Sequence, residues 1–381
     1  MRGVHNLTAG GFHRVRRETK LRVFETIRSD EHEEILFGQD PVSGLRTIVA
    51  IHSTTLGPAL GGTRFFPYAN EDDALVDVVR LSKGMTYKAA VAGLNLGGGK
   101  GVIIGDPSQV KNEPLLRAYG RIIESLGGRY ITAEDVGTTT DDMIMIRRET
   151  KHVAGMPTTH GGSGDPSPAT ARGVLAAMRA TAMQAWGTDD LAGKTVAVQG
   201  VGKVGGDVVR RLSAVGVKTV VTDVNQQAVS AIAESCGSTV VDADEIYDTD
   251  ADIFAPCAMG ASLNESTIPR LRCELIVGSA NNQLASADDA QRLINRNILY
   301  APDFVVNAGG IINIAEEAPG YSEDRAILAV DRIYDTLTRV FATAKDRGIG
   351  PSEAANAIAE ERIAMAKQQT LSDRTQEVRS A

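Results

Sequence analysis

The segment TVAVQGVGKVGGDVVRRLSAVG, residues 195–216, decides the fold that the sequence predicts. It starts with an apolar strand-like run, passes through a G-x-G-x-x-G turn (Gly200, Gly202, Gly205) and ends in a helical pattern. A second strand-like run, VKTVVTD, follows and ends on Asp223. This order of strand, glycine turn, helix and acidic residue is typical of a Rossmann-type unit that binds a dinucleotide.

The glycine turn and the aspartate also indicate which dinucleotide is bound. The glycines let a pyrophosphate approach the helix N-terminus, where free N–H groups and the helix dipole favour an anion. Asp223 would accept hydrogen bonds from the ribose hydroxyls and repel a 2′-phosphate, so we expect NAD rather than NADP. The alternative is a glycine-rich turn beside an exposed aspartate. The predicted cofactor-binding residues of this unit are Gly200, Gly202, Lys203, Val204, Gly205 and Asp223.

Length and pattern predict two domains. A chain of 381 residues is too long for one ordinary core. The segment GMPTTHGGSGDPSPAT, residues 155–170, is too rich in Gly, Pro, Ser and Thr for a helix or strand and predicts an interdomain connection. Strand-like runs such as TIVAIHS and GVIIG alternate with helical stretches before it, and the alternation resumes after a helix at about 168–186. Such alternation favours sheets covered by helices.

The predicted fold class is therefore α/β, with two domains, of which the second is the Rossmann-type NAD-binding domain. The tail, at about 322–367, is helical by pattern and could pack on either domain. The predicted boundaries are a flexible N-terminal arm at 1–20, a first domain at 21–155 plus 330–367, and an NAD-binding domain at 165–325.

Composition argues against several classes of partner. The formal net charge of −8 disfavours nucleic acid and anionic membranes, because either would require a basic face. The three cysteines are widely spaced with no CxxC pair, which indicates reduced thiols in a cytoplasmic protein. The six histidines show no HxxxH or HExxH spacing, so we expect no metal site. No run approaches the roughly 20 apolar residues of a membrane span, and the N-terminus lacks the apolar core of a secretion signal.

A lysine stands on an apolar helix face in the segment NEDDALVDVVRLSKGMTYKAAVAGL, residues 70–94. Asn70 is a candidate N-cap with Asp73 at the third helical position. Leu81, Met85 and Lys88 share one face by their spacing. Burying the charge of a lysine on such a face costs free energy unless that charge is paired. It could extend its ammonium to the surface, but an anionic ligand explains its place better.

A second lysine follows three glycines in NLGGGKGVIIGDP, residues 95–107, directly before an apolar strand-like run. Glycine is costly to order, so such a run marks a place where the backbone approaches something closely. A P-loop does not fit, because Leu94 and Gly101 break its pattern and a strand rather than a helix follows Lys100.

Two adjacent acids occur in GGRYITAEDVGTT, residues 127–139. If RYITAED is a strand, Glu134 and Asp135 point to opposite faces. Only one of them can then enter a cleft with the lysines, and the other is a solvated or capping acid. The residues alone leave this choice open.

Seven motifs together resemble the Glu/Leu/Phe/Val dehydrogenase family, with leucine and valine dehydrogenases as its most similar members. The resemblance runs in order from about residue 36 to 365, and the motifs are LGPALGGTR, KGMTYKAAVAGLNLGGGKGVIIGDP, GRYITAEDVGTT, VAVQGVGKVG, DIFAPCAMG, GSANNQL and YAPDFVVNAGGIIN. The resemblance implies reversible oxidative deamination of an L-amino acid to a 2-oxo acid and ammonia, with hydride passing to NAD. It also implies that the first domain is an N-terminal α/β substrate-binding and oligomerisation domain, that a catalytic cleft separates it from the Rossmann-type domain, and that the protein is a homo-oligomer.

The resemblance also implies roles for individual residues. Lys88 of GMTYK binds the substrate α-carboxylate, and Lys100 of GGGK is the catalytic lysine. Asp135 of TAEDVG is the proton-transfer carboxylate, which settles the choice left open above. Asn281 of GSANNQL lies near nicotinamide and substrate, and Thr170 of PSPAT lies near the carboxamide.

A base is needed because hydride leaves Cα only from a neutral amine. A free lysine with a pKa near ~10.4 is a poor base at neutral pH. Burial and the neighbouring cation Lys88 would lower the pKa of Lys100, and a value of roughly 7–8 would suit the task. Because glycine has no side chain, we expect few polar groups close to Lys100.

The substrate side chain is expected to meet aliphatic residues. The family's pocket segments place Leu60, Gly61, Gly62, Met85, Ala133, Ile311 and Ile314 there. None is charged, so glutamate is disfavoured, and valine, leucine or isoleucine is preferred over phenylalanine. A hydroxy-acid dehydrogenase would use a histidine and an arginine instead, and a non-catalytic NAD-sensing protein has no use for Lys88. Cys257 of APCAMG has no evident base beside it and is expected to be a packing thiol.

Overall fold

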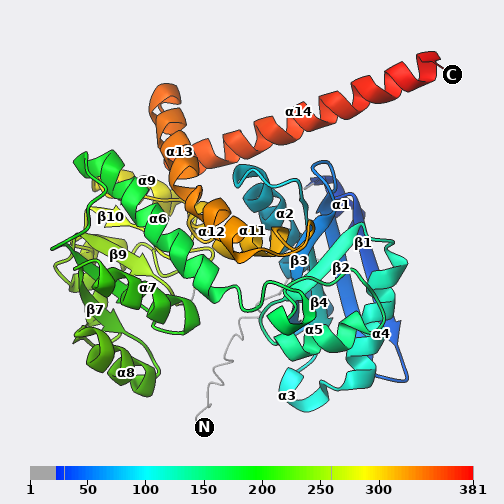
Figure 1. The fold of residues 1–381 in the computed structure, drawn as a ribbon, viewed down its shortest axis with the longest axis horizontal. Coiled ribbons are helices and arrows are strands. Elements are labelled where there is room, and N and C mark those ends of the chain that lie inside the picture. The colour runs from blue at the N-terminus through cyan, green and yellow to red at the C-terminus, as the bar shows by residue number, and fades with distance from the viewer. Residues whose placement is uncertain (1–22, 30, 259, 381) are drawn as a thin grey trace, which may run out of the picture.

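The computed structural model describes residues 23–29, 31–258 and 260–380. The predicted N-terminal arm, residues 1–20, lies outside these. The described chain forms two α/β halves, each built on its own sheet, and the two sheets stand on opposite sides of the molecule (Figure 1). The predicted two-domain α/β architecture is confirmed.

The first half is a five-stranded mixed sheet in the order β1-β2-β4-β3-β5. Its strands are β1 (Glu34–Asp40), β2 (Leu45–Ser53), β3 (Ala59–Phe66), β4 (Gly97–Ile104) and β5 (Tyr130–Glu134). β2 is antiparallel to both β1 and β4, whereas β3 runs parallel to β4 and β5. Apolar side chains of α2 (Glu71–Val91) pack on one face, and those of α4 (Glu113–Ser125) and α5 (Thr140–Arg147) pack on the other. Two short helices, α1 (Val23–Ser29) and α3 (Pro107–Val110), complete this half.

The glycine run lies inside strand β4, not before it as the sequence predicted. Helix α2 rests so closely on this strand that a Cβ added at Gly98 would lie 2.1 Å from the Thr86 nitrogen. One added at Gly97 would lie 1.9 Å from the Ser53 carbonyl oxygen. Strand propensity alone disfavours glycine, but here only glycine leaves room for the neighbouring backbone. The helix that carries Lys88 is thereby brought against the strand that carries Lys100.

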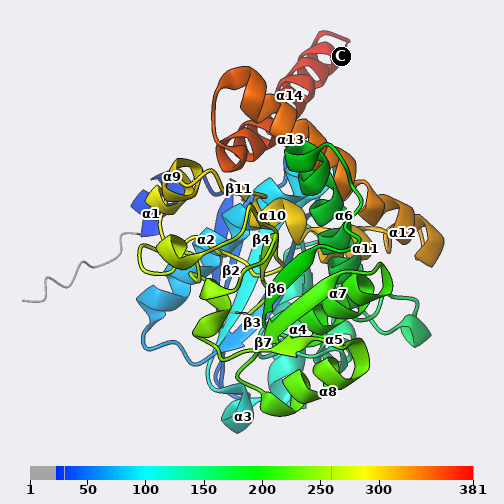
Figure 2. The ribbon, with the colours of Figure 1, turned by 90° about the vertical axis from the view of Figure 1, so that its left-hand side faces the viewer.

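The second half is a six-stranded parallel sheet in the order β11-β10-β9-β6-β7-β8. Figure 2 shows this half from the side, with its neighbouring strands β6 and β7 labelled. The strands are β6 (Thr195–Gln199), β7 (Lys218–Thr222), β8 (Thr239–Val240), β9 (Ile253–Pro256), β10 (Leu275–Ile276) and β11 (Leu299–Tyr300). The helices are α6 (Ser167–Trp186), α7 (Lys203–Ala214), α8 (Gln226–Cys236) and α9 (Asp288–Asn295), with 3-10 turns at Glu245–Asp248 and Ile268–Arg270. The glycine turn joins β6 to α7, as a Rossmann-type unit requires.

The segment between the halves contains only a 3-10 turn, Thr158–His160, before α6 begins. After the second sheet come α10 (Asp303–Val306), α11 (Gly309–Ala315), α12 (Glu323–Asp331), α13 (Ile333–Arg347) and α14 (Pro351–Ser380). Helix α13 packs against α6, whereas α14 crosses to α2 and extends away from the body (Figure 1). The Arg362 guanidinium donates to backbone carbonyls at the end of α2, those of Ala89, Ala90, Gly93 and Leu94. No helix of the described chain is long and apolar enough to cross a membrane.

Candidate active site between the two halves

A cavity of about 300 Å³ lies between the two halves and is lined by both. The first half contributes residues of β3, α2, β4 and β5, and the second contributes Thr170, Asn281 and residues of α10 and α11. Every residue assigned to the substrate by sequence lines this cavity, namely Leu60, Gly61, Gly62, Met85, Lys88, Lys100, Ala133, Asp135, Asn281, Ile311 and Ile314. Leu81 joins Met85 and Lys88 there, as the helical spacing predicts.

Lys100 and Asp135 form an ion pair at the centre of the site. Lys100 is 5% exposed, and its Nζ lies 2.6 Å from the Asp135 Oδ2. Strand β3 runs between β4, which carries Lys100, and β5, which ends just before Asp135, and Gly62 on β3 lets Asp135 come close. A Cβ added at Gly62 would lie 2.8 Å from the Asp135 Cβ. The expectation that few polar groups lie close to Lys100 is therefore wrong, because the strand order places the Asp135 carboxylate beside it.

The two adjacent acids have separate partners. β5 ends at Glu134, so Asp135 lies just beyond the strand and not within it as predicted. The Glu134 Oε2 accepts a hydrogen bond from the Thr140 hydroxyl (2.9 Å) in the first turn of α5. Of the two carboxylates, it is that of Asp135 that meets the lysine.

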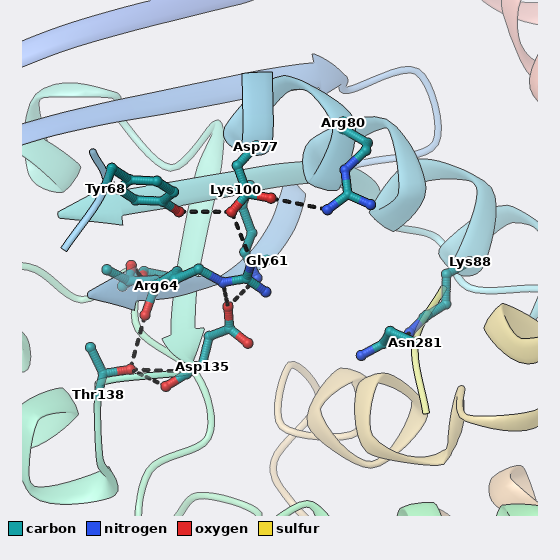
Figure 3. A network of polar contacts seen from close by, with 12 residues as sticks. Gly61, Arg64, Tyr68, Asp77, Arg80, Lys88, Lys100, Asp135, Thr138 and Asn281 are labelled. Atoms are coloured by element: carbon teal, nitrogen blue, oxygen red, sulfur yellow. Dashed lines mark hydrogen bonds and ion pairs between the residues drawn. The ribbon is translucent and has the colours of Figure 1, made fainter. Parts of the chain in front are cut away.

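Arg64 is the second cation at Asp135, and sequence reasoning missed it. Its Nε lies 3.2 Å from the same Asp135 Oδ2 (Figure 3). Burial raises the pKa of Asp135, but Lys100 and Arg64 outweigh burial and hold that pKa below its ordinary value. The period of two along β3 places Arg64 on the same face as Leu60, a predicted pocket residue, so alternation was the signal available.

Lys88 faces the residues of the second half. It is half-buried, and its Nζ donates to the Asn281 Oδ1 at 3.4 Å (Figure 3). Burial lowers the pKa of Lys88 to about 8, with Lys100 contributing in the same direction and Asp303 opposing. Of the two lysines in the site, Lys88 is thus one whose pKa the protein lowers.

Asn307 is a further polar residue that sequence reasoning did not single out. Its Nδ2 donates to the Asn281 Oδ1 (2.7 Å) and fixes that side chain. Its own Oδ1 is buried and accepts no hydrogen bond within the described chain. Because Asn307 lines the cavity, a donor on a bound ligand could satisfy this oxygen.

The remaining wall of the cavity is aliphatic where the substrate side chain is expected. A Cβ added to Gly155, in the segment between the halves, would lie within about 4 Å of the side chains of Ala133 and Ile314.

Two arginines also line the cavity, but both are paired with Asp77. The Arg64 Nη1 donates to it at 2.8 Å and the Arg80 Nη2 at 3.1 Å. No arginine here is left for a distal carboxylate without breaking such a pair.

The glycine turn has the shape of a dinucleotide cradle. Gly200 adopts a φ of 97°, and a Cβ added at Gly205 would lie 2.0 Å from the Gly200 carbonyl oxygen, so strand and helix meet closely. A Cβ added at Gly202 would meet nothing within 4 Å, and no side chain caps α7 at this end. The N-terminal N–H groups of α7 are therefore free for a pyrophosphate. These residues fit the predicted cofactor.

The other predicted cofactor residues surround this turn. The Asp223 carboxylate accepts from the Val201 N–H (2.7 Å) and the Asn225 N–H (2.9 Å), so it lies beside the turn. Lys203 pairs with Asp165 of the connection (Nζ to Oδ2, 3.2 Å), and Val204 packs into the core. Thr170 lines the cavity, and its hydroxyl donates to the Pro166 carbonyl. Together, fold and cavity define a dinucleotide-dependent dehydrogenase, and two lysines and a carboxylate line its cavity.

Comparison with known proteins gives the family. Residues 32–152 match the family model described as Glu/Leu/Phe/Val dehydrogenase, dimerisation domain, and residues 220–370 match Glutamate/Leucine/Phenylalanine/Valine dehydrogenase. The chain belongs to this family. A model for the NAD-binding domain of D-isomer specific 2-hydroxyacid dehydrogenases also matches, over residues 169–268. That match covers only part of the half that carries the dinucleotide turn.

Individual relatives cover nearly the whole chain. Leucine dehydrogenase of Bacillus cereus is 52% identical over 91% of this chain and 95% of its own length. Valine dehydrogenase of Streptomyces coelicolor (88% of this chain, 93% of its own) and phenylalanine dehydrogenase of Lysinibacillus sphaericus (88% of each) are both 50% identical. The crystal structure of L-tryptophan dehydrogenase from Nostoc punctiforme superposes with a TM-score of 0.80 at 45% identity, covering 91% of this chain and all of that one. The predicted family, the amino acid dehydrogenase class and NAD as cofactor are confirmed.

Proposed function

We propose that the chain catalyses the reversible, NAD-dependent oxidative deamination of branched-chain L-amino acids to 2-oxo acids and ammonia. The observation that carries this proposal is the meeting of Lys88, Lys100 and Asp135 in one cavity that also has an aliphatic wall, formed by Leu60, Met85, Ala133, Ile311 and Ile314. The names of the leucine and valine dehydrogenases among its relatives support the same substrates.

Each of the three residues has a task that follows from its place. Lys88, turned toward Asn281, is the cation for the substrate α-carboxylate. Lys100 takes the proton of the substrate amine, and with Asp135 it transfers protons to and from the water that replaces the amine. The protonated form of Lys100 also stabilises the negative charge that develops on the oxygen atom contributed by this water. NAD, when bound at the Gly200–Gly205 turn with Asn281 and Thr170 near its nicotinamide, supplies the acceptor for the hydride that leaves Cα.

The pocket supports valine, leucine or isoleucine as the preferred substrate, with phenylalanine as the alternative. Leu60, Met85, Ala133, Ile311 and Ile314 present only aliphatic groups. A difference of one methylene is worth only about 1–3 kcal/mol, so several branched-chain substrates should react. A non-catalytic NAD-sensing protein would have no need for Lys88, Lys100 and Asp135 in one cavity.

The assembly and location belong to the same proposal. A homo-oligomer formed through the first half is supported by the match of residues 32–152 to a model described as a dimerisation domain. We place the domain boundaries at 21–155 plus 330–367 and at 165–325, and the packing of α14 on α2 supports the return of the chain to the first domain. A cytoplasmic location is supported by Cys236, Cys257 and Cys273, which are all free.

A substrate panel tests the proposal. Initial rates with valine, leucine, isoleucine, phenylalanine and glutamate, each with NAD and with NADP, should give the highest kcat/KM for a branched-chain substrate with NAD. The reverse reaction should depend on ammonia, which a hydroxy-acid dehydrogenase does not need. The highest kcat/KM for phenylalanine would contradict the pocket argument, and cofactor binding without turnover would contradict the proposed activity.

A further inference from the structure

Arg64 joins two carboxylates of the site. Its Nε lies 3.2 Å from the Asp135 Oδ2, and its Nη1 lies 2.8 Å from the Asp77 Oδ2. Asp77 is held in turn by the Tyr68 hydroxyl (2.7 Å) and by Arg80 (3.1 Å) (Figure 3). A planar guanidinium bonded at both ends has little freedom, so the position of Asp135 is coupled to helix α2 through Arg64.

Arg64 and Lys100 meet the same oxygen of Asp135, but only Lys100 gains and loses a proton in the reaction. If Lys100 becomes neutral, Arg64 is the cation still in contact with this carboxylate. A guanidinium stays protonated in proteins, so its charge does not change during the cycle. Without it, the carboxylate would compete with Lys100 for the substrate proton, because an unpaired buried carboxylate binds protons more strongly.

The other charges around Asp135 do not duplicate this contact. From α2, Lys88 acts on Asp135 through space only, and Asp77 lies behind Arg64. From α10, Asp303 acts on Lys88. The neighbouring Glu134 is bonded to Thr140.

We infer that Arg64 is a positioning residue for proton transfer, which directs the Asp135 carboxylate at Lys100 and returns it to the ionised form between its proton transfers, while the charge of Lys100 changes. This inference rests on the proposed function, in which Lys100 and Asp135 exchange protons with substrate and water. It assigns Arg64 no contact with the reacting atoms.

Two variants and a control test the inference in the full-length enzyme. Arg64→Met removes the positive charge. Arg64→Lys keeps the charge but lacks the planar guanidinium, whose separate nitrogens bond Asp77 and Asp135. Arg148→Met is the matched control, because Arg148 pairs with Glu113 on the surface of the same half (2.5 Å). The measurements are kcat and KM for leucine between pH 6 and 10, the Kd for NADH, and the melting temperature.

For Arg64→Met we expect kcat to fall about 10- to 100-fold, up to the loss of about 100-fold that a small misplacement of a catalytic group can cause. The KM for leucine should change less than about threefold, because Lys88 and the aliphatic wall remain. The acidic limb of the kcat/KM profile should move up by about one pH unit, because loss of the adjacent cation raises the apparent pKa of the Lys100–Asp135 pair, whose base must be unprotonated to react. Arg64→Lys should leave that limb in place and still reduce kcat, and Arg148→Met should match the wild type.

An unchanged acidic limb in Arg64→Met, or wild-type kcat in either Arg64 variant, would overturn the inference. If Arg64→Met does not fold, Arg64→Lys decides alone: a reduced kcat with normal NADH binding supports the positioning role, and a wild-type kcat removes it. A wild-type enzyme that deaminates no amino acid would instead contradict the proposed function, so the two failures are distinguishable.

Discussion

The Lys100 Nζ and the Asp135 Oδ2 lie 2.6 Å apart across strand β3, and Gly62 on that strand leaves them room to meet. This pair lies wholly within the first half of the molecule. It also ties the basic group for the substrate amine to a carboxylate held ionised by a second cation, Arg64. The proposed acid–base chemistry depends on this relationship.

Replacing Lys100 should stop deamination without stopping cofactor binding. Lys100→Ala removes the base and leaves Asp135 with Arg64, so we expect kcat to fall at least about 100-fold, the lower end of what general acid–base groups contribute. NADH binding, followed by its fluorescence, should stay within about threefold of the wild type, because the Gly200–Gly205 turn belongs to the other half. A variant that retains more than a tenth of wild-type turnover would remove Lys100 from the base role.

The adjacent acids offer a matched pair of variants one residue apart. Asp135→Asn removes the carboxylate paired with Lys100 and should reduce kcat by at least about 100-fold. Glu134→Gln keeps an oxygen that can accept from Thr140 and should stay within about threefold of the wild type. Steady-state rates with leucine and NAD compare the two. Normal kinetics for Asp135→Asn together with a crippled Glu134→Gln would reverse the assignment.

Local pattern was enough to predict the helix face with Lys88 and the dinucleotide turn, because both depend on residues near one another in sequence. Asn70 caps α2 through the Asp73 N–H (2.9 Å), as its spacing predicts. The partners of Lys100 and Arg64 could not be found in this way. Lys100 meets Asp135 only because β3 lies between β4 and β5, and this strand order is a long-range property.

The predicted start of strand β4, after the glycine run and not within it, was wrong for a related reason. Strand propensity disfavours glycine, so the sequence put the strand after the run. The requirement that overrides propensity is the close approach of helix α2 and of other backbone to β4. That requirement comes from the packing partner, which the sequence of the strand alone does not contain.

Substrate binding should weaken in alkaline solution because of Lys88. Its pKa is lowered to about 8, and only the protonated form attracts a carboxylate, so the favourable interaction is present below this pH and is lost above it. The Ki of 4-methylpentanoate, which has leucine's side chain but no amine, should be flat near pH 6 to 7 and rise up to about tenfold per unit well above pH 8. Lys88→Met should bind it weakly with no such dependence. A Ki that stays constant to pH 10 in the wild type would show that Lys88 remains charged.

The close approach at Gly98 should appear in stability. In Gly98→Ala the new Cβ would lie 2.1 Å from the Thr86 nitrogen, which is backbone and has little freedom to move. We expect a loss of at least about 1–3 kcal/mol in the free energy of unfolding, as for overpacked cores. Gly84→Ala is the control, because Gly84 lies inside α2 with nothing within 4 Å of an added Cβ, and helix propensity favours alanine by about 1 kcal/mol. Urea unfolding of both variants checks this, and equal stability in the two would contradict the packing argument.

Ile314 should limit the size of the substrate side chain. Leu60 and Ile314 line both the catalytic cavity and a second cavity of about 300 Å³ behind it, so they separate the two spaces. Ile314→Ala shortens this wall and should raise the ratio of kcat/KM for phenylalanine over that for valine by about 10- to 200-fold, the range associated with small changes in a hydrophobic pocket. Ile312→Ala makes the same change on the same helix at a buried residue that does not line the catalytic cavity, and it should leave the ratio unchanged even if the melting temperature falls. An equal change of the ratio in both variants would mean that general loosening of α11, not the removed wall, sets the preference.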